Sequence, residues 1–236
     1  MFNVDNNKAK EIVDAVFKDV FGVNNSFTLE KVKEKFAFDI PLPQRIGCIL
    51  SGKDTWVVSK ENNKIASQKA LEEEFKKSEW MRKKEEISSI GDLLRCWNKI
   101  NYVTGDKNLN SQDVFGSDGV YTSASVFNSH AVFKSKNIIY SYKIFDCNYM
   151  IACRDNESST FGIRMRESVN CSSGFEISWC EKVSRSMYVH DGVDIYECMF
   201  CSHIRSKKYC IANMQFSKDE YFKIKKQVIE WILDSS

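Results

Sequence analysis

Proline and long apolar runs are both scarce in this sequence. Only 2 of its 236 residues are proline, and no apolar run approaches the roughly 18 residues that a membrane-spanning helix needs. The N-terminal segment MFNVDNNKAK also lacks the basic start and the apolar stretch of a secretory signal. We therefore expect a soluble, cytoplasmic protein without a membrane partner.

A large net charge is missing too. The 34 Lys and Arg side chains nearly balance the 32 Asp and Glu side chains, which leaves a formal net charge of +2. Dedicated DNA- and RNA-binding proteins usually carry a marked basic excess, so the overall charge does not indicate nucleic-acid binding, although a local basic patch is not excluded. The motifs GxGxxG, Walker A, HExxH and GxSxG are absent as well.

Helical periodicity dominates the N-terminus. Apolar residues recur at helical spacing through residues 6–21, and Gly22 stands where the end of a helix favours glycine. Thr28 is the expected N-cap of a second helix that runs to about Phe36. The sequence therefore predicts two consecutive N-terminal helices.

A β-hairpin and further helices should follow. Strand-like segments at 45–50 and 55–59 flank a turn-rich connection, helix formers dominate 66–86, and a short helix should contain Leu93. Two helices and a hairpin also fit a winged-helix module, but the second helix lacks the Arg, Lys, Asn or Gln cluster that would contact bases. We therefore interpret residues 1–101 as an α+β domain that caps the rest of the chain.

The next segment repeats every six residues. The first position of each hexad is aliphatic and the fourth is Ser or Cys, seven times in succession. The first positions are Val114, Val120, Val126, Val132, Ile138, Ile144 and Met150. The fourth positions are Ser117, Ser123, Ser129, Ser135, Ser141, Cys147 and Cys153. This pattern predicts a parallel β-helix over residues 102–213, with aliphatic columns inside and a small residue where each corner narrows.

Each hexad should form a short strand and a corner. About three hexads would complete one coil of triangular cross-section, which gives roughly four to five coils in all. The register breaks at residues 156–159, which we interpret as a projecting loop, and resumes with a shift of three residues. The second block has first positions at Met165, Cys171, Ile177, Val183, Val189 and Ile195, and fourth positions at Ser168, Gly174, Cys180, Ser186, Gly192 and Cys198.

This pattern resembles the hexapeptide-repeat left-handed β-helix family. The second block approaches the family's motif through apolar residues two positions apart, such as Val193 and Ile195. The resemblance implies acyltransferase-like enzymes, often trimeric, in which a histidine at a subunit boundary is the general base. The histidines of this chain are His130, His190 and His203, and a solvated surface position is the simpler interpretation of each.

The first block departs from the family's motif because a second apolar column directly follows the first. Its members are Phe115, Tyr121, Phe127, Phe133, Ile139, Phe145 and Ile151. Adjacent strand residues point to opposite faces, so one of the two columns should lie at a corner or face outward; which of the two does so, and the handedness of the coil, stay open. The aromatic residues Phe115, Tyr121, Phe127, Phe133 and Phe145 are therefore a candidate binding surface, covered by the N-terminal domain or by a partner.

A C-terminal helix should close the repeat. Ser217 and Glu220 have the spacing of a capping box that opens an amphipathic helix to about Leu233. Within residues 214–236 this helix would cap the open end of the β-helix and its unpaired strand edge. Residues 209–221 are similar to the tail of uncharacterised hexad-repeat proteins of phages and small-genome bacteria, which implies an architecture but no activity.

The nine cysteines favour reduced thiols or metal ligands over disulfides, because the chain shows no export signal. Cys198 and Cys201 have the spacing of a zinc-binding pair, with His203 and Cys210 nearby. Most of the cysteines nevertheless occupy repeat positions, where a free thiol fits as a small interior residue. We therefore expect no cofactor, with zinc at these four residues as the alternative.

The sequence favours a non-enzymatic protein-binding or scaffold protein that binds a protein partner or associates with itself. If a phage encodes it, the protein would act in the host cytoplasm in anti-defence, in the virion or in host takeover. An acyltransferase-like enzyme is the first alternative. A nucleic-acid-associated accessory protein, acting through the N-terminal helices and the hairpin, is the second.

Overall fold

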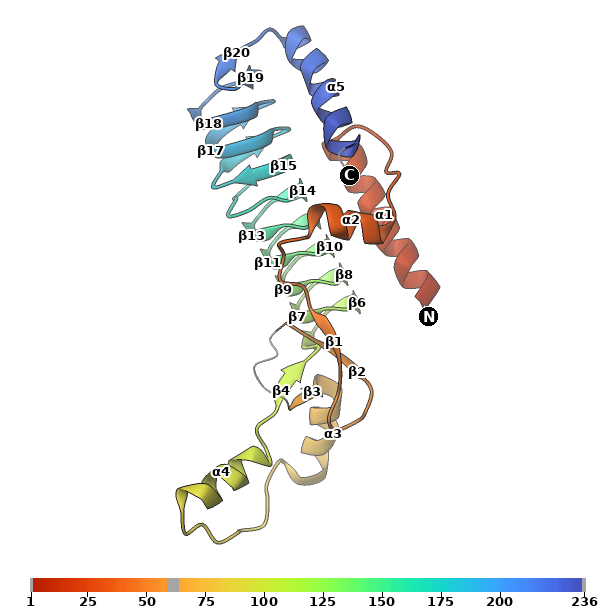
Figure 1. The fold of residues 1–236 in the computed structure, drawn as a ribbon, viewed down its shortest axis with the longest axis vertical. Coiled ribbons are helices and arrows are strands. Elements are labelled where there is room, and N and C mark those ends of the chain that lie inside the picture. Colours follow the sequence, from red (N-terminus) through yellow and green to blue (C-terminus); the bar gives the residue numbers. More distant parts are fainter. Residues whose placement is uncertain (1, 59–63, 235–236) are drawn as a thin grey trace.

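The computed structural model describes residues 2–58 and 64–234. It has N-terminal helices with a β-hairpin, a central parallel β-solenoid of about 9 turns and a C-terminal helix, which confirms the predicted α+β fold. Three helices lie along one side of the elongated solenoid, and a fourth projects beyond its lower end (Figure 1). Among the described residues, no helix is long and apolar enough to cross a membrane.

The two N-terminal helices form where the sequence predicts them. Helix α1 (Phe2–Val20) is followed by Gly22, which adopts a left-handed φ of 72°. Helix α2 (Leu29–Phe36) begins after Thr28, whose hydroxyl accepts a hydrogen bond from the Lys31 amide at 3.2 Å. The end of α1 and the start of α2 therefore have the residues that commonly end and begin a helix.

The predicted hairpin is formed by the antiparallel strands β1 (Gln44–Gly47) and β2 (Asp54–Val57); Ser59, the last residue of the predicted second strand, lies outside the described residues. Strand β3 (Ile65–Ser67) leads into α3 (Gln68–Ser78), and α4 (Ile90–Asn98) follows. The helix predicted over 66–86 is thus wrong beyond residue 78, because the next two residues adopt left-handed φ values of 49° and 61° and end it.

The solenoid consists of short strands separated by corners. Its strands are β4 (Val103–Gly105), β5 (Asn108–Leu109), β6 (Gln112–Phe115), β7 (Asp118–Tyr121), β8 (Ala124–Phe127), β9 (His130–Phe133), β10 (Lys136–Ile139), β11 (Tyr142–Phe145), β12 (Asn148–Ile151), β13 (Arg154–Glu157), β14 (Thr160–Ile163), β15 (Ser172–Ser178), β16 (Glu181–Ser184), β17 (Met187–Tyr196), β18 (Met199–Arg205), β19 (Cys210–Ile211) and β20 (Met214–Gln215). Strands β5 to β19 pair in parallel, and β19 and β20 close the end as an antiparallel hairpin.

One coil contains two hexads, which corrects the predicted three. Val114 pairs with Val126, and Val126 with Ile138, so parallel partners are 12 residues apart. Every third residue from Asp113 to Ala212 has a positive φ, which places four corners in each coil. The cross-section is therefore four-sided rather than triangular, and the same repeat makes about 9 turns instead of four to five.

Fourth-position Ser and Cys side chains join neighbouring coils. The Ser129 hydroxyl accepts a hydrogen bond from the Ser141 amide, one coil later, at 3.0 Å and donates to the Phe127 carbonyl at 2.8 Å. The thiols of Cys147 and Cys153 accept the amides one coil later at 3.4 Å in the same way. These bonds satisfy buried amides that would otherwise have no partner. We call this series from Ser111 to Ser159 the Ser/Cys ladder.

The predicted loop at 156–159 is wrong. Strand β13 pairs with β11 through these residues, and the three-residue spacing of corners continues without interruption. Asn156 faces inward and is 2 % exposed; its side-chain amide donates to the carbonyls of Arg154 and Met165. The large side chains move to inward columns three residues away, and the path of the backbone is unchanged.

Glycine makes room where large side chains change column. A Cβ at Gly162 would lie 2.7 Å from Met165 Sδ, and one at Gly192 would lie 2.8 Å from Val189 Cγ1. Columns that hold valine and isoleucine in the first coils hold glycine, serine or cysteine in the later ones, while former serine columns become aliphatic. The core stays filled because the columns exchange roles.

Helices lie on one face of the solenoid and at its first coil. Helices α1, α2 and α5 (Lys218–Asp234) pack together on one face of the solenoid, while β3 and α3 lie beside the first coil. The capping box is confirmed: the Ser217 amide donates to Glu220 Oε2 at 3.0 Å, and the Glu220 amide donates to the Ser217 hydroxyl at 3.4 Å. Residues 1–101 therefore contribute both to a side face and to an end of the solenoid, and the boundaries at 101 and 213 stay predictions.

We expect Ser129→Ala to lower the free energy of unfolding by about 1–3 kcal/mol, because it leaves the buried Ser141 amide without an acceptor. Ser129→Cys is the matched variant, since thiols already accept such amides at Cys147 and Cys153. The free energy of unfolding should fall clearly less in Ser129→Cys than in Ser129→Ala. Urea unfolding of both variants measures the difference, and equal losses would contradict the role given to the Ser/Cys ladder.

A second prediction concerns the glycines of the core. Gly192→Ala should cost about 1–3 kcal/mol of unfolding free energy, because the stiff, β-branched Val189 and Ile195 cannot move aside. Gly162→Ala should cost less, because it meets only the flexible ends of Met150 and Met165. Denaturant unfolding compares the two variants. A larger loss of unfolding free energy in Gly162→Ala than in Gly192→Ala would contradict this packing of the inward columns.

Candidate binding surface

Residues six positions apart lie half a coil apart and therefore on opposite faces, given the 12-residue pairing. On one face, α1, α2 and α5 bury an apolar outward column: Phe127, Ile139, Ile151, Ile163, Phe175, Met187 and Met199. On the opposite face, paired strands align Leu109, Tyr121, Phe133 and Phe145. We call these four residues the exposed strip, because Leu109, Phe133 and Phe145 are 55 %, 37 % and 43 % exposed and Tyr121 is half-buried.

The structure divides the predicted aromatic column between these two faces. Tyr121, Phe133 and Phe145 belong to the exposed strip, while Phe127 is 3 % exposed beneath the helices. Phe115 lies on the covered face but near its end, where it is 37 % exposed and stacks on Phe127 at 5.5 Å. The N-terminal helices therefore cover the column at alternate hexads, and coverage of the other hexads by a partner stays a prediction.

The aromatic residues of the exposed strip form a row, in which Tyr121 stacks on Phe133 and Phe145 is tilted by 37° against Phe133. The ring centroids of Tyr121 and Phe133 are 5.0 Å apart and nearly parallel at 13°, and those of Phe133 and Phe145 are 6.5 Å apart. Lys134 Nζ lies 5.6 Å from the Phe145 centroid. Four coils at a strand spacing of about 4.8 Å give the strip a length of roughly 14 Å. It ends where Glu157 pairs with Phe145.

A second stack borders the strip. The rings of His130 and Tyr142 are 5.6 Å apart and tilted by only 7°, on the column that begins with Asp118. Asp118 is 1 % exposed, and its carboxylate accepts the Lys107 ammonium at 3.1 Å and the Lys107 amide at 2.9 Å. This buried ion pair holds the first coil against the second.

His130 is held in a defined orientation. Its Nδ1 lies 2.9 Å from the Asp118 carbonyl, and because a carbonyl oxygen only accepts, Nδ1 carries the proton and Nε2 is left as an acceptor. Burial lowers the pKa of His130 below its ordinary value, although Asp118 opposes this shift. The imidazole is therefore neutral at pH 7.

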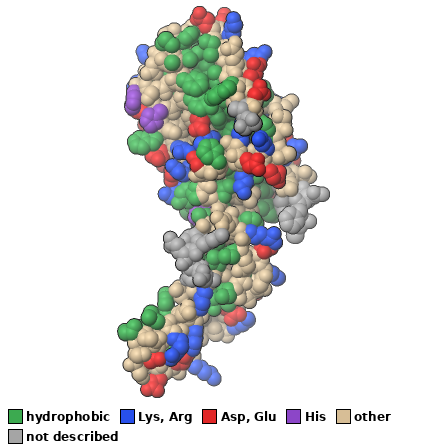
Figure 2. Space-filling model, viewed as in Figure 1, with side chains coloured by type: hydrophobic (Ala, Val, Ile, Leu, Met, Phe, Trp, Pro, Cys, Tyr) green, Lys and Arg blue, Asp and Glu red, His purple; other side chains and the backbone are tan. Residues whose placement is uncertain are grey.

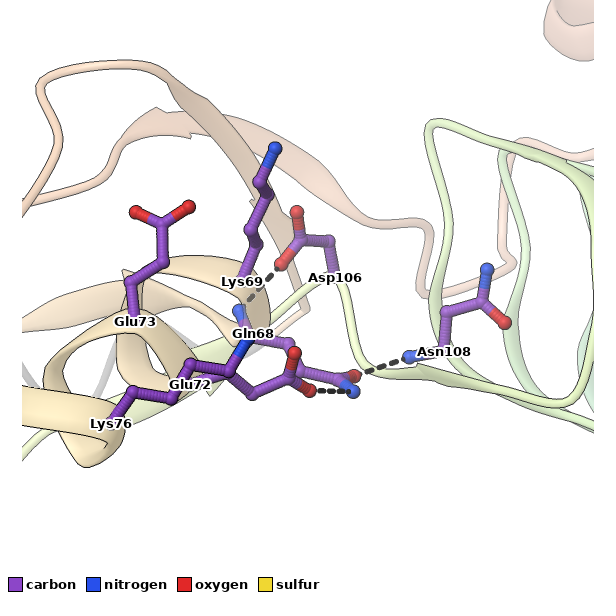
Figure 3. Close-up of a pocket in the computed structure, with 7 residues that line it drawn as sticks. All are labelled: Gln68, Lys69, Glu72, Glu73, Lys76, Asp106 and Asn108. Atoms are coloured by element: carbon purple, nitrogen blue, oxygen red, sulfur yellow. Dashed lines mark hydrogen bonds between the residues drawn. The ribbon is translucent and has the colours of Figure 1, made fainter. Parts of the chain in front are cut away.

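A polar hollow of about 400 Å³ lies near the end of the strip, beside Asn108. It is lined by Gln68, Lys69, Glu72, Glu73, Lys76, Asp106 and Asn108, and Figure 3 shows them around the start of α3. The Gln68 amide donates to Asp106 at 3.0 Å, and the Gln68 side chain bridges Glu72 and Asn108. Burial raises the pKa of Asp106 above its usual value. These contacts join α3 to the first coils, and the mixed charges favour no single ligand class.

The candidate zinc ligands are not all brought together. Cys198, Cys201 and Cys210 face inward in the last coils, but His203 occupies a corner, is exposed, and bonds Asp191 Oδ2 at 2.6 Å through Nδ1. A contact between two of these thiols lowers the pKa of Cys201 and raises that of Cys198. Within residues 2–58 and 64–234, no three His, Cys, Asp or Glu side chains are grouped to hold a metal.

The N-terminal helices and the hairpin do not form a winged-helix unit. Val32 and Phe36 of α2 pack in the core that α1 shares with the solenoid, whereas Cys48 beside the hairpin packs with Ala66 and Ala70 near α3. The apolar face of α2 is therefore already used within the chain. This arrangement adds no support to the nucleic-acid hypothesis, which stays a prediction.

Sequence reasoning missed Leu109, His130 and Tyr142 as members of this surface. Leu109 stands 12 residues before Tyr121, and Tyr142 stands 12 after His130. Reading the hexads in pairs would have found all three. Comparison with known proteins adds no further guide, since no protein-family model, no curated protein and no solved structure matches the chain.

The buried thiols predict a specific loss of stability at alkaline pH. Burial raises the pKa of Cys147 to about 11 and those of Cys153 and Cys171 to about 12, from an ordinary 9.0. Above pH 9 the unfolded chain releases these protons and the folded chain does not, so stability falls with rising pH, by up to about 1.4 kcal/mol per pH unit for each thiol.

The measurement is urea unfolding between pH 8 and about 11. A variant with Ser at Cys147, Cys153 and Cys171 keeps a hydroxyl at each position, and its unfolding free energy should fall less steeply than that of the wild type. Identical slopes would mean that these thiols do not titrate on unfolding.

Proposed function

We propose that the protein is a non-enzymatic binding or scaffold protein and that the exposed strip is the place where a protein partner docks. The observation that supports this most is the contrast between the two faces. Equivalent outward columns are apolar on both, but α1, α2 and α5 cover only one of them. An exposed, continuous row of large apolar side chains is typical of an interaction site.

The covered face suggests what kind of partner would fit. There, Ile12, Val16 and Phe17 of the amphipathic helix α1 pack on the stacked outward residues of the strands. The exposed strip has the same coil spacing and the same type of side chain. A partner that presents the apolar face of a helix is therefore chemically suited to it.

Rigidity and charge agree with this proposal. Strands β7, β9 and β11, which carry the three aromatic residues of the strip, are each paired in parallel with a neighbour on both sides, so little order has to be gained on binding. Lys134 and Lys143 flank the strip together with Asp146 and Asp155. These opposite charges favour neither a nucleic acid nor a strongly acidic partner.

An acyltransferase-like enzyme is the second candidate because His130 has an acceptor Nε2 and a neutral ring beside Asp118. A histidine in this state can serve as a general base. Against it, the coil of two hexads departs from the triangular coil of three hexads that the repeat predicted. A stable trimer in solution would favour the enzyme, whereas the binding protein requires no trimer. A phage source and the roles that follow from it remain predictions.

Site-specific photo-crosslinking tests the proposal. A photoreactive phenylalanine analogue in place of Phe133 or Phe145 should, in the cells where the protein acts, join the same partner from both positions. The analogue at Val169 is the control, since Val169 is 36 % exposed on the same column, beyond Glu157. Adducts that do not differ between the strip and Val169 would contradict the proposal.

The partner found in this way allows a quantitative test. Phe133→Ala with Phe145→Ala should weaken its binding by about 2 kcal/mol or more, as expected for aromatic residues at the centre of an interface. The same pair should change the unfolding free energy by less than about 1 kcal/mol, because both rings are already exposed. Unchanged affinity in isothermal titration calorimetry would exclude the strip as the docking site.

A further inference from the structure

Residues 79–101, which we call the arm, carry an apolar surface away from the solenoid (Figure 1). Helix α4 has no buried residue. Its apolar side chains follow helical spacing along one stripe: Ile90 (71 % exposed), Leu93 (48 %), Leu94 (58 %) and Trp97 (55 %). The projecting lower end shows apolar side chains beside charges of both signs (Figure 2). An amphipathic helix of this kind is stabilised by packing its stripe against something.

Polar contacts within the arm hold its two ends together and leave the stripe free. Arg82 Nη1 donates to the Cys96 carbonyl at 3.2 Å, and Lys99 Nζ lies 2.9 Å from Glu85 Oε2. The arm leaves α3 through Glu79 and Trp80, both in the left-handed region, which is uncommon for residues this large. This turn directs α4 away from α3.

An apolar hollow of about 400 Å³ lies on α3, next to the start of the arm. Its apolar wall is formed by Leu71, Phe75 and Trp80, and Glu72 and Lys76 lie at its edge. Phe75 is 53 % exposed. The hollow therefore has the size of a site that accepts large side chains, about 300–1,000 Å³.

We propose that the arm joins two copies of this chain, with α4 of each copy docked in the α3 hollow of the other. The chain itself supplies both an apolar ridge and an apolar hollow, as a symmetric interface requires. Asp92 and Arg95 of α4 form an ion pair at 2.6 Å, and the hollow carries the opposite charges, Lys76 and Glu72, with which they could exchange partners.

The charge of the arm also favours a second copy over an anionic surface. The arm has a net charge of +1, because it contains five positive and four negative residues. The positive ones are Arg82, Lys83, Lys84, Arg95 and Lys99, and the negative ones are Glu79, Glu85, Glu86 and Asp92. Helices that lie on anionic membranes carry a clear excess of Lys and Arg.

The area involved is sufficient for a dimer. Eight large apolar side chains of the arm and the hollow are exposed: Phe75, Met81, Ile87, Ile90, Leu93, Leu94, Trp97 and Ile100. Aromatic side chains bury about 150–250 Å² when fully covered and aliphatic ones bury less; since these eight are 38–76 % exposed, covering them would remove on the order of 700 Å² per copy. Two reciprocal contacts then reach the roughly 1,200–2,000 Å² of a stable interface.

Sedimentation equilibrium of the full chain tests the proposal. The wild type should have twice the mass of one chain, and Trp97→Glu should weaken the dimer at least about 30-fold, the loss expected for a central interface aromatic. Trp179→Glu is the matched control, because Trp179 is 63 % exposed on the solenoid, far along the chain from the arm. It should remain a dimer. Neither change removes a buried side chain, so both variants should fold.

A mixing experiment identifies the two halves of the contact. Phe75→Glu alters the hollow and should also give a monomer. Mixed with Trp97→Glu, it should form a heterodimer that is weaker than the wild-type dimer but stronger than a dimer of either variant, because one of the two reciprocal contacts is intact. A wild-type monomer, or a Phe75→Glu variant that stays dimeric, would overturn the proposal.

Binding to vesicles of neutral and anionic phospholipid is the remaining measurement. A monomer whose tryptophan fluorescence shifts on adding them, where Trp97→Glu shows no such shift, would assign the stripe to a lipid surface and reject the dimer. Because Phe133→Ala leaves the arm unchanged, it should not alter the mass, so failure of this inference is distinguishable from failure of the exposed strip as a docking site.

Discussion

A hydrogen bond between neighbouring coils governs this solenoid. Ser and Cys side chains of the Ser/Cys ladder accept the amide of the residue 12 positions later and donate to a carbonyl two positions before. A side chain must be short and must both donate and accept to make these two bonds inside the core. The ladder joins residues one coil apart, so its spacing of 12 residues corresponds to two hexads per coil. A coil of two hexads has four inward columns, and it determines which outward residues meet the helices.

Local elements could be predicted because local chemistry specifies them. Thr28 and Ser217 cap their helices, Gly22 ends one, and the alternation of inward and outward residues follows from the strands. Coil length could not be read from the six-residue period, since that period describes one strand with its corner and either two or three such units can close a coil. The sequence does contain a further signal: outward residues spaced by 12 stay apolar from Phe127 to Met199, whereas the intervening ones become mixed after Phe145.

The same geometry explains which candidate residues come together. The aromatic column was recognised from the sequence, but its division between two faces required the coil length. The Cys198, Cys201 and His203 set fails to converge because position 201 points inward and position 203 is a corner. The helical stripe of α4 follows from its spacing, but its exposure does not, since that depends on the left-handed turn at Glu79 and Trp80.

The most direct test of this account is disulfide formation between residues one coil apart. Thr160 and Ser172 are parallel partners on outward positions, and strands about 4.8 Å apart bring Cα atoms within disulfide range. The Thr160→Cys and Ser172→Cys pair should therefore crosslink on mild oxidation, as mass spectrometry would show. Thr160→Cys with Ser178→Cys spans three hexads and should not. Crosslinking of the second pair and not of the first would contradict the two-hexad coil.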